Sequence, residues 1–485
     1  MNYFRNFILS LTIICLLFSC KKDIFSPNTN VKLNFSQSTV YFDTVLTTVG
    51  TVTQSFTVYN RNSQDITISS IKLALGNTSN FRINVDGVPV PASGITNVLI
   101  RSKDSLFVFV AATINPTNHN NPILIQDSVM FLTNGNTQTV DLMAYGQDAY
   151  FYKPNVFPTD GSPPYIVLNC NDVWNNDKPH VILGYAVVNS SCTLTINAGT
   201  QVYVHNNGVL YVNSGGTLKV QGTYSNPVTF QGDRLDPAYS TVAGQWGKIW
   251  LSPGSLNNTI DWAIIKNGTV GVEADTLGQP MSSGPTLKIS NTIIKNMSNL
   301  AIAGLGSYIT GFNCVFADCQ SYSAAFQYGG KYSFKQCTFA DYWSSSYTAT
   351  GRQTPLLLIN NWYQDVNGNI QQRAIDSAYF GNCIFYGNLN NEIGYDSTYG
   401  GNGNFNVFFQ NCLMRTTLPV SNGYHYSNNI VNQDPQFNNV TKEDYTIGGS
   451  SAVIGKGNSI IGNWYPMDLN NKPRISPPDI GAYQH

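Results

Sequence analysis

The chain has 485 residues, of which 11% are charged and 12% are aromatic, and its formal net charge is −1. This composition lacks the basic footprint of nucleic-acid-binding proteins, so we exclude a nucleic-acid partner. Gly, Asn, Ser and Thr are abundant and long amphipathic helical patterns are absent, which is typical of turn-rich, all-β, secreted proteins. The length is sufficient for two or three domains.

Residues 1–19 have the features of an export signal. Arg5 supplies the positive charge near the start, and residues 7–17 form an apolar run that is too short to span a membrane as a stable helix. The sequence therefore predicts that the protein leaves the cytoplasm and loses this segment.

The export signal ends in Leu17-Phe18-Ser19-Cys20, which resembles the lipobox of bacterial lipoproteins. The resemblance implies that Cys20 carries the lipid, and cleavage of an ordinary secretory signal elsewhere is the alternative. Lys21 follows Cys20 where an inner-membrane retention signal has Asp, which implies the outer membrane of a Gram-negative cell. Membrane contact would then be through the lipid anchor only.

Residues 31–147 alternate between apolar and polar side chains, as in Leu106-Phe-Val-Phe-Val110. About seven strands separated by polar turns predict an antiparallel β-sandwich of immunoglobulin type, which would act as a spacer. Residues 20–30 are expected to be a tether and residues 148–164 a linker.

A recurring motif of an amide, a cysteine and a large apolar residue organises the second half of the chain. It occurs as Asn313-Cys-Val-Phe316, Gln336-Cys-Thr-Phe339, Asn382-Cys-Ile-Phe385 and Asn411-Cys-Leu-Met414. A weaker form of the motif, Asn291-Thr-Ile-Ile294, precedes these four. Counted from Asn291, the steps between amide positions are 22, 23, 46 and 29 residues. The step of 46 is twice 23 and predicts one coil without the motif. Because alternate residues of a strand face one side, the motif predicts a parallel β-helix with Cys and Phe inside. About ten to twelve coils fit the available length.

Further motifs resemble one known family. Leu194-Thr-Ile-Asn-Ala-Gly199 and Asn226-Pro-Val-Thr-Phe230 are similar to the opening coils of right-handed parallel β-helix lipoproteins, which have a pectin lyase-like fold. Asp434-Pro-Gln-Phe437 and Pro478-Asp-Ile-Gly-Ala-Tyr483 resemble their C-terminal segment. The resemblance covers residues 165–485, with a closing segment from about 434, and implies a fold and a surface location. The family carries no uniform activity, so no catalytic residue is transferred.

Seven cysteines follow the leader, and an odd number cannot pair fully within one chain. The motif cysteines are expected to stack as small buried hydrophobic residues. Cys170 and Cys192 lie about one coil apart and are the one pairing that we consider. No spacing of Cys and His indicates a zinc site, and we predict no metal ligands.

One column of polar residues could carry chemistry. Alignment of the coils places Asn267, Asn296, Asp318 and Asp341 at one position, just after an inward-facing strand. Carboxylates on adjacent coils would lie about 5 Å apart, which suits a glycosidase pair or a shared Ca²⁺, the one cofactor left open. The alternative is structural, because Asn and Asp tolerate left-handed turns. Glu392 is a third candidate acid, with a solvated surface position as its alternative.

Two long inserts, within residues 341–376 and 386–404, are rich in aromatic side chains. Inserts on neighbouring coils emerge on one side of a solenoid, often the binding side, and exposed rings there would suit sugars. The candidate ligand-binding residues are Trp343, Tyr347, Trp362, Tyr363 and Tyr395. A self-packed loop cluster that covers the core is the alternative.

Three hypotheses follow for the function. The first is an outer-membrane lipoprotein whose β-helix binds a glycan or another surface ligand without catalysis. The second is a polysaccharide lyase or glycoside hydrolase acting on an extended polymer, which requires carboxylates, or a Lys or Arg base with calcium, grouped on one outer face. The third is a purely structural or adhesive surface protein. The sequence does not indicate the oligomeric state.

Overall fold

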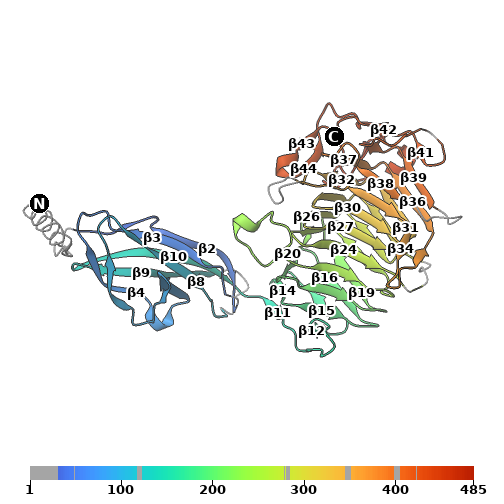
Figure 1. Ribbon diagram of the computed structural model, residues 1–485. Coiled ribbons are helices and arrows are strands. Elements are labelled where there is room, and N and C mark those ends of the chain that lie inside the picture. The colour runs from blue at the N-terminus through green and yellow to red at the C-terminus, as the bar shows by residue number, and fades with distance from the viewer. Residues whose placement is uncertain are drawn as a thin grey trace, which may run out of the picture. The chain divides into compact units, whose positions relative to one another are not determined.

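The computed structural model describes residues 31–48, 50–116, 123–277, 279, 284–343, 351–397, 405–421 and 423–485. The chain divides into two compact units, Met1–Asp148 and Ala149–His485, and both are built from strands (Figure 1). The predicted signal and Cys20 lie outside the described residues. Within the described ranges, no helix has the length and apolar character needed to cross a membrane.

The first unit is a sandwich of two five-stranded sheets, as predicted. One sheet has the order β1 (Asn34–Phe35), β3 (Gln54–Tyr59), β8 (Ser105–Ala112), β5 (Phe81–Val85) and β6 (Val88–Pro89). The other has the order β2 (Thr39–Leu46), β10 (Asn136–Gln147), β9 (Ile123–Thr133), β4 (Ile66–Leu73) and β7 (Ile95–Ile100). In β8 the period of two buries Leu106, Val108 and Val110 between the sheets, while Phe107 and Phe109 are exposed.

The second unit is the predicted parallel β-helix, in which three parallel sheets run the length of the unit (Figure 1). The 11-stranded sheet contains β11 (Tyr150–Tyr152), β14 (His180–Ile182), β17 (Gln201–Val204), β20 (Val228–Gly232), β23 (Ala263–Lys266), β26 (Ile293–Met297), β29 (Val315–Cys319), β32 (Thr338–Asp341), β37 (Ile384–Gly387), β40 (Leu413–Met414) and β42 (Ile430–Val431). The 9-stranded sheet contains β12 (Tyr165–Val167), β15 (Tyr185–Val188), β18 (Val209–Val212), β21 (Lys248–Leu251), β24 (Val270–Asp275), β27 (Leu300–Leu305), β30 (Tyr322–Gln327), β33 (Leu357–Asn360) and β38 (Ile393–Asp396). The 10-stranded sheet contains β13 (Val173–Trp174), β16 (Thr193–Asn197), β19 (Thr217–Gln221), β22 (Asn258–Asp261), β25 (Leu287–Ser290), β28 (Tyr308–Phe312), β31 (Gly330–Lys335), β36 (Ile375–Gly381), β39 (Phe405–Gln410) and β41 (Tyr426–Ser427).

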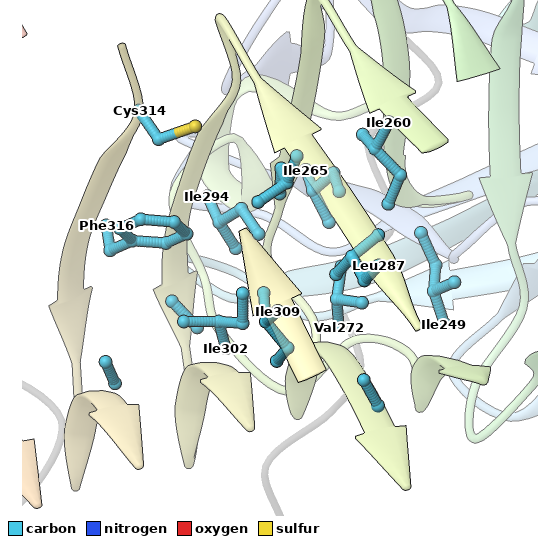
Figure 2. Close-up of a cluster of buried hydrophobic side chains, with 14 of the residues drawn as sticks. Ile249, Ile260, Ile265, Val272, Leu287, Ile294, Ile302, Ile309, Cys314 and Phe316 are labelled. Carbon is cyan, nitrogen blue, oxygen red and sulfur yellow. The ribbon is translucent and has the colours of Figure 1, made fainter. Parts of the chain in front are cut away.

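Identical positions of successive coils stack inside the solenoid. Ile265 pairs with Ile294, and Ile294 pairs with Phe316, so their side chains form one column in the core (Figure 2). Phe339 and Phe385 continue this column, with centroids 4.9 Å apart for Phe316 and Phe339 and 4.7 Å apart for Phe339 and Phe385. The four motif cysteines are likewise free and fully buried, as predicted.

The amide that precedes each motif cysteine forms a corner of the solenoid. Asn313, Gln336, Asn382 and Asn411 have φ between 49° and 54°, where the chain turns from the 10-stranded sheet into the 11-stranded sheet. Asn is among the few residues that accept this left-handed conformation at low cost, which explains its recurrence there.

Two predictions about coil boundaries were wrong. The step of 46 residues does not contain a coil without the motif, because β32 pairs directly with β37 and the additional residues are insertions. One of these insertions is the hairpin of β34 (Trp362–Gln364) and β35 (Ile370–Gln372). The expected linker at 148–164 already contributes β11, which pairs with β14 and begins the first coil.

The C-terminal segment lies against the side of the solenoid. Tyr445, Leu469 and Ala482 pack on outward-facing residues of the 11-stranded sheet, including Val315 and Ala317. The segment includes the hairpin of β43 (Phe437–Asn439) and β44 (Asp444–Ile447) (Figure 1). It therefore covers an apolar outer face of that sheet, where it brings distant residues next to the predicted polar column.

Candidate functional site

The predicted polar column exists in the structure. Ala317 pairs with Ala340, so Asp318 and Asp341 follow each other on adjacent coils. Asn296 lies one coil earlier, opposite Asp318. Asn296 in β26 and Asp318 in β29 have φ of 57° and 51°, so both adopt the left-handed backbone conformation. The structural explanation of the column therefore holds for these positions, and a chemical role must rest on what each side chain contacts.

Asp318 is one of the residues that line a cleft. Its Oδ2 accepts a 2.5 Å hydrogen bond from the Tyr445 hydroxyl, and its Oδ1 accepts one of 3.2 Å from the Tyr342 backbone N–H. Only 7% of its surface is exposed, and this burial raises its pKa to about 6, although the Tyr445 hydrogen bond opposes the shift. Asp318 is thus a carboxyl group that can change protonation state near neutral pH while it faces a cleft.

Asp341 is completely buried and cannot meet a substrate. Its Oδ2 accepts hydrogen bonds from the Cys319 N–H and the Ser323 hydroxyl, and its Oδ1 accepts one from the Trp343 N–H. Burial raises the pKa of Asp341 to about 7, and the nearby Arg352 opposes this shift. The expected pair of catalytic carboxylates is therefore not formed by Asp318 and Asp341, because only Asp318 borders the cleft.

Glu392 is neither a lone acid nor a solvated one, contrary to both predictions for it. Its side chain is fully buried, and its Oε1 lies 2.6 Å from Nη2 of Arg352. Arg352 Nε is 3.4 Å from Oδ1 of Asp341. One buried guanidinium thus lies between two buried carboxyl groups and compensates their charge in the interior.

The candidate aromatic residues do not form one exposed platform. Trp343 is 6% exposed and borders the Asp318 cleft. Trp362 and Tyr363 belong to the β34–β35 hairpin, where Tyr363 packs against Tyr328 at 5.1 Å between centroids. Tyr395 packs against the solenoid core and borders a separate cavity. Tyr347 lies outside the described residues.

The cleft itself has a volume of about 450 Å³. It is lined by Thr241, Asn296, Asp318, Tyr342, Trp343, Asn388, Val440, Thr441 and Glu443. Glu443 is the second carboxyl group at the cleft, and its oxygens lie 2.5 Å from Lys295 Nζ and 3.0 Å from Asn296 Nδ2. The cleft thus combines aromatic rings, carboxamides and two carboxyl groups.

Sequence reasoning missed the C-terminal contribution to this cleft. Tyr445 lies 127 residues after Asp318 and Glu443 lies 147 residues after Asn296, and no local pattern connects these positions. In the part of the chain that the structure describes, no three His, Cys, Asp or Glu side chains are grouped to hold a metal ion.

Comparison with known proteins places the β-helix in context. Residues 167–278 match the family model of the pectate-lyase like β-helix domain. No curated protein sequence matches this chain. The match to residues 167–278 agrees with the right-handed parallel β-helix expected from the sequence, and the sheet order shows the expected β-sandwich in the first unit.

Among solved structures, the catalytic unit of a GH87 α-1,3-glucanase from Streptomyces thermodiastaticus aligns over 78% of this chain and 75% of its own, at 11% identity and a TM-score of 0.30. A PapD-like domain of human CEP192 aligns over 27% of this chain and 95% of its own, at 12% identity and a TM-score of 0.17. A family 123 glycoside hydrolase from Clostridium perfringens aligns over 25% of this chain, at 9% identity and a TM-score of 0.18, and this chain spans only 30% of its length. At these scores none of the three bears on the activity of this chain.

Proposed function

We propose that this protein is a lipoprotein of a bacterial outer membrane whose β-helix binds a glycan in the Asp318 cleft. The observation that carries the proposal is the composition of the cleft, where Trp343 and Tyr342 lie beside the carboxamides of Asn296 and Asn388 and the carboxyl group of Asp318. Sugars present apolar ring faces and polar edges. The partly exposed ring of Tyr342 can contact a ring face and the polar groups can contact the edges, while Trp343 presents only the small part of its ring that is not buried.

The pectate-lyase like β-helix model that residues 167–278 match supports a carbohydrate ligand of some kind. Export is supported by the disulfide between Cys170 and Cys192, the pairing considered from the sequence, because disulfides persist in oxidising compartments. The lipid on Cys20 would hold the protein at the membrane.

Hydrolysis of a glycan is a second candidate, and the state of Asp318 favours it. A carboxyl group with a pKa of about 6 can donate its proton to a glycosidic oxygen while a second carboxylate activates water. Glu443 is the second carboxyl group at the cleft, but Lys295 and Asn296 engage both of its oxygens. This engagement makes binding the better-supported function.

Both functions can be tested with the soluble chain that begins at Lys21. Binding to a panel of neutral and acidic polysaccharides would be measured by affinity electrophoresis and calorimetry, and newly formed reducing or unsaturated ends would be assayed. We expect Asp318→Asn and Tyr342→Phe, which nearly preserve side-chain volume, to weaken binding at least tenfold.

Asp376→Asn is the matched control, because Asp376 is an exposed residue on another sheet. This variant should bind the glycan as tightly as the unmodified chain. If Asp318→Asn and Tyr342→Phe bind the polysaccharide as tightly as the control does, the cleft is not the binding site. Release of new ends that Asp318→Asn abolishes would establish the hydrolase instead.

A further inference from the structure

The outer face of the 9-stranded sheet carries an aromatic column in the first coils. Val187 of β15 pairs with Tyr211 of β18, and Tyr211 pairs with Trp250 of β21. Because these residues occupy the same outward-facing position on successive coils, their side chains follow one another along the solenoid axis. Tyr185 adds another ring two residues before Val187 on β15, at the next outward-facing position.

These residues line a groove of about 490 Å³ on the first four strands of the 9-stranded sheet. The rings of Tyr211 and Trp250 meet edge to face, with centroids 5.1 Å apart. The carboxamides of Asn189 and Asn213 form one polar side of the groove, joined by a 3.3 Å hydrogen bond. The groove therefore offers aromatic surface beside amide groups, on strands that are held rigidly in register.

The charge around this groove indicates what it can accept. None of the described residues that line it is charged. Lys248, next to Trp250 on β21, lies 2.7 Å from Glu273 and has its ammonium 4.1 Å from the centre of the Trp250 ring. Because this pair satisfies its own charges, the groove provides no free cation for an acidic polymer.

We propose that this groove binds a neutral glycan chain that runs parallel to the solenoid axis. The strands recur about every 4.8 Å, a distance close to the length of one pyranose unit, so successive rings can meet successive sugars. Aromatic surface would contact the apolar faces of the sugars, while the two carboxamides would bond hydroxyl groups at their edges. The ligand class rests on the proposed function, but the groove shares no lining residue with the Asp318 cleft.

The test uses the soluble chain from Lys21 with Trp250→Ala and Trp250→Phe. The matched control is Trp464→Ala, because Trp464 is 77% exposed and lies outside both the groove and the cleft. Neutral hexasaccharides of glucose, xylose and mannose, with oligogalacturonate as the acidic comparison, would be titrated by calorimetry. Thermal unfolding would verify that each variant is folded.

We expect a neutral hexasaccharide to bind, Trp250→Ala to weaken this binding at least tenfold, and Trp250→Phe to weaken it less. Trp464→Ala should bind like the unmodified chain. Equal binding by Trp250→Ala and Trp464→Ala, or binding of oligogalacturonate alone, would overturn the inference. A change in sedimentation of Trp250→Ala without sugar would also overturn it, since the groove would then join two copies of the chain.

The cleft variants separate this inference from the proposed function. If Asp318→Asn weakens binding and Trp250→Ala does not, the groove inference fails and the cleft proposal stands. If Trp250→Ala weakens binding and Asp318→Asn does not, the groove inference stands and the cleft proposal fails.

Discussion

Asp318 illustrates how burial changes the chemistry of a single residue. An exposed Asp has a pKa of about 3.9, whereas Asp318 in the folded protein has a pKa of about 6 because it is removed from water. The folded state therefore binds this proton more tightly than the unfolded state. Asp318 supports folding fully below about pH 4, and this support is lost as the pH rises to about 6.

We predict that Asp318→Asn removes this pH dependence. Between pH 4 and pH 6 the unmodified chain should lose up to about 3 kcal/mol relative to the variant, and the difference should be constant above that range. Urea unfolding at a series of pH values measures this difference in the free energy of unfolding. The Asp318 charge also helps to raise the pKa of Asp341, so the measured difference includes the change that Asp318→Asn makes in the titration of Asp341. Parallel stability curves for the two proteins would contradict the prediction.

At the scale of the element, the corner before each motif cysteine determines where the chain leaves one sheet for the next. Asn313 has a φ of 49°, which most residues with a Cβ atom adopt only at a cost. Its carboxamide also donates to the Met467 carbonyl at 2.8 Å and accepts from Arg474 at 2.9 Å. One residue thus forms the corner and holds the C-terminal segment against the solenoid.

We predict that Asn313→Ala lowers the free energy of unfolding by about 3 kcal/mol, from the strained corner together with the lost hydrogen bonds. Asn313→Gly should cost less, because glycine accepts a positive φ but lacks the carboxamide. Urea unfolding of both variants separates the two contributions. An equal loss in the two variants would show that backbone conformation at this corner has no effect on stability.

At the scale of the whole molecule, the chain combines a β-sandwich, a β-helix and a C-terminal segment that covers one face of the solenoid. Residues far apart in the sequence meet only through this last packing, as Asp318 and Tyr445 do. The proposed attachment to a membrane depends on a different part of the chain, the predicted lipid on Cys20.

We predict that the full chain, expressed in a Gram-negative host, fractionates with the outer membrane and incorporates labelled palmitate. Cys20→Ala should lose the label, because the proposed lipid would be attached through this thiol, and should no longer be found among mature lipoproteins of the membrane. Membrane fractions and label would be compared for the two proteins. A labelled Cys20→Ala protein would show that Cys20 is not the lipidation site.

The folds of both units can be predicted from the order of residues alone, because strand alternation and stacking of identical positions are local and periodic. The 22- and 23-residue steps, the buried motif cysteines and the column through Asp318 all follow from that periodicity. Insertions interrupt this periodicity, which is why the step of 46 residues predicts an additional coil although β32 pairs directly with β37.

Which of the candidate residues can meet a ligand depends on how the chain packs in three dimensions. From the sequence, Asp318, Asp341 and Glu392 are all candidate acids. In the structure, Arg352 pairs with Asp341 and Glu392 in the interior. Asp318 instead lines a cleft, where it accepts a hydrogen bond from Tyr445. Such contacts depend on how inserts and the C-terminal segment pack on the solenoid. This packing joins residues without a common period, so no repeat in the sequence encodes it.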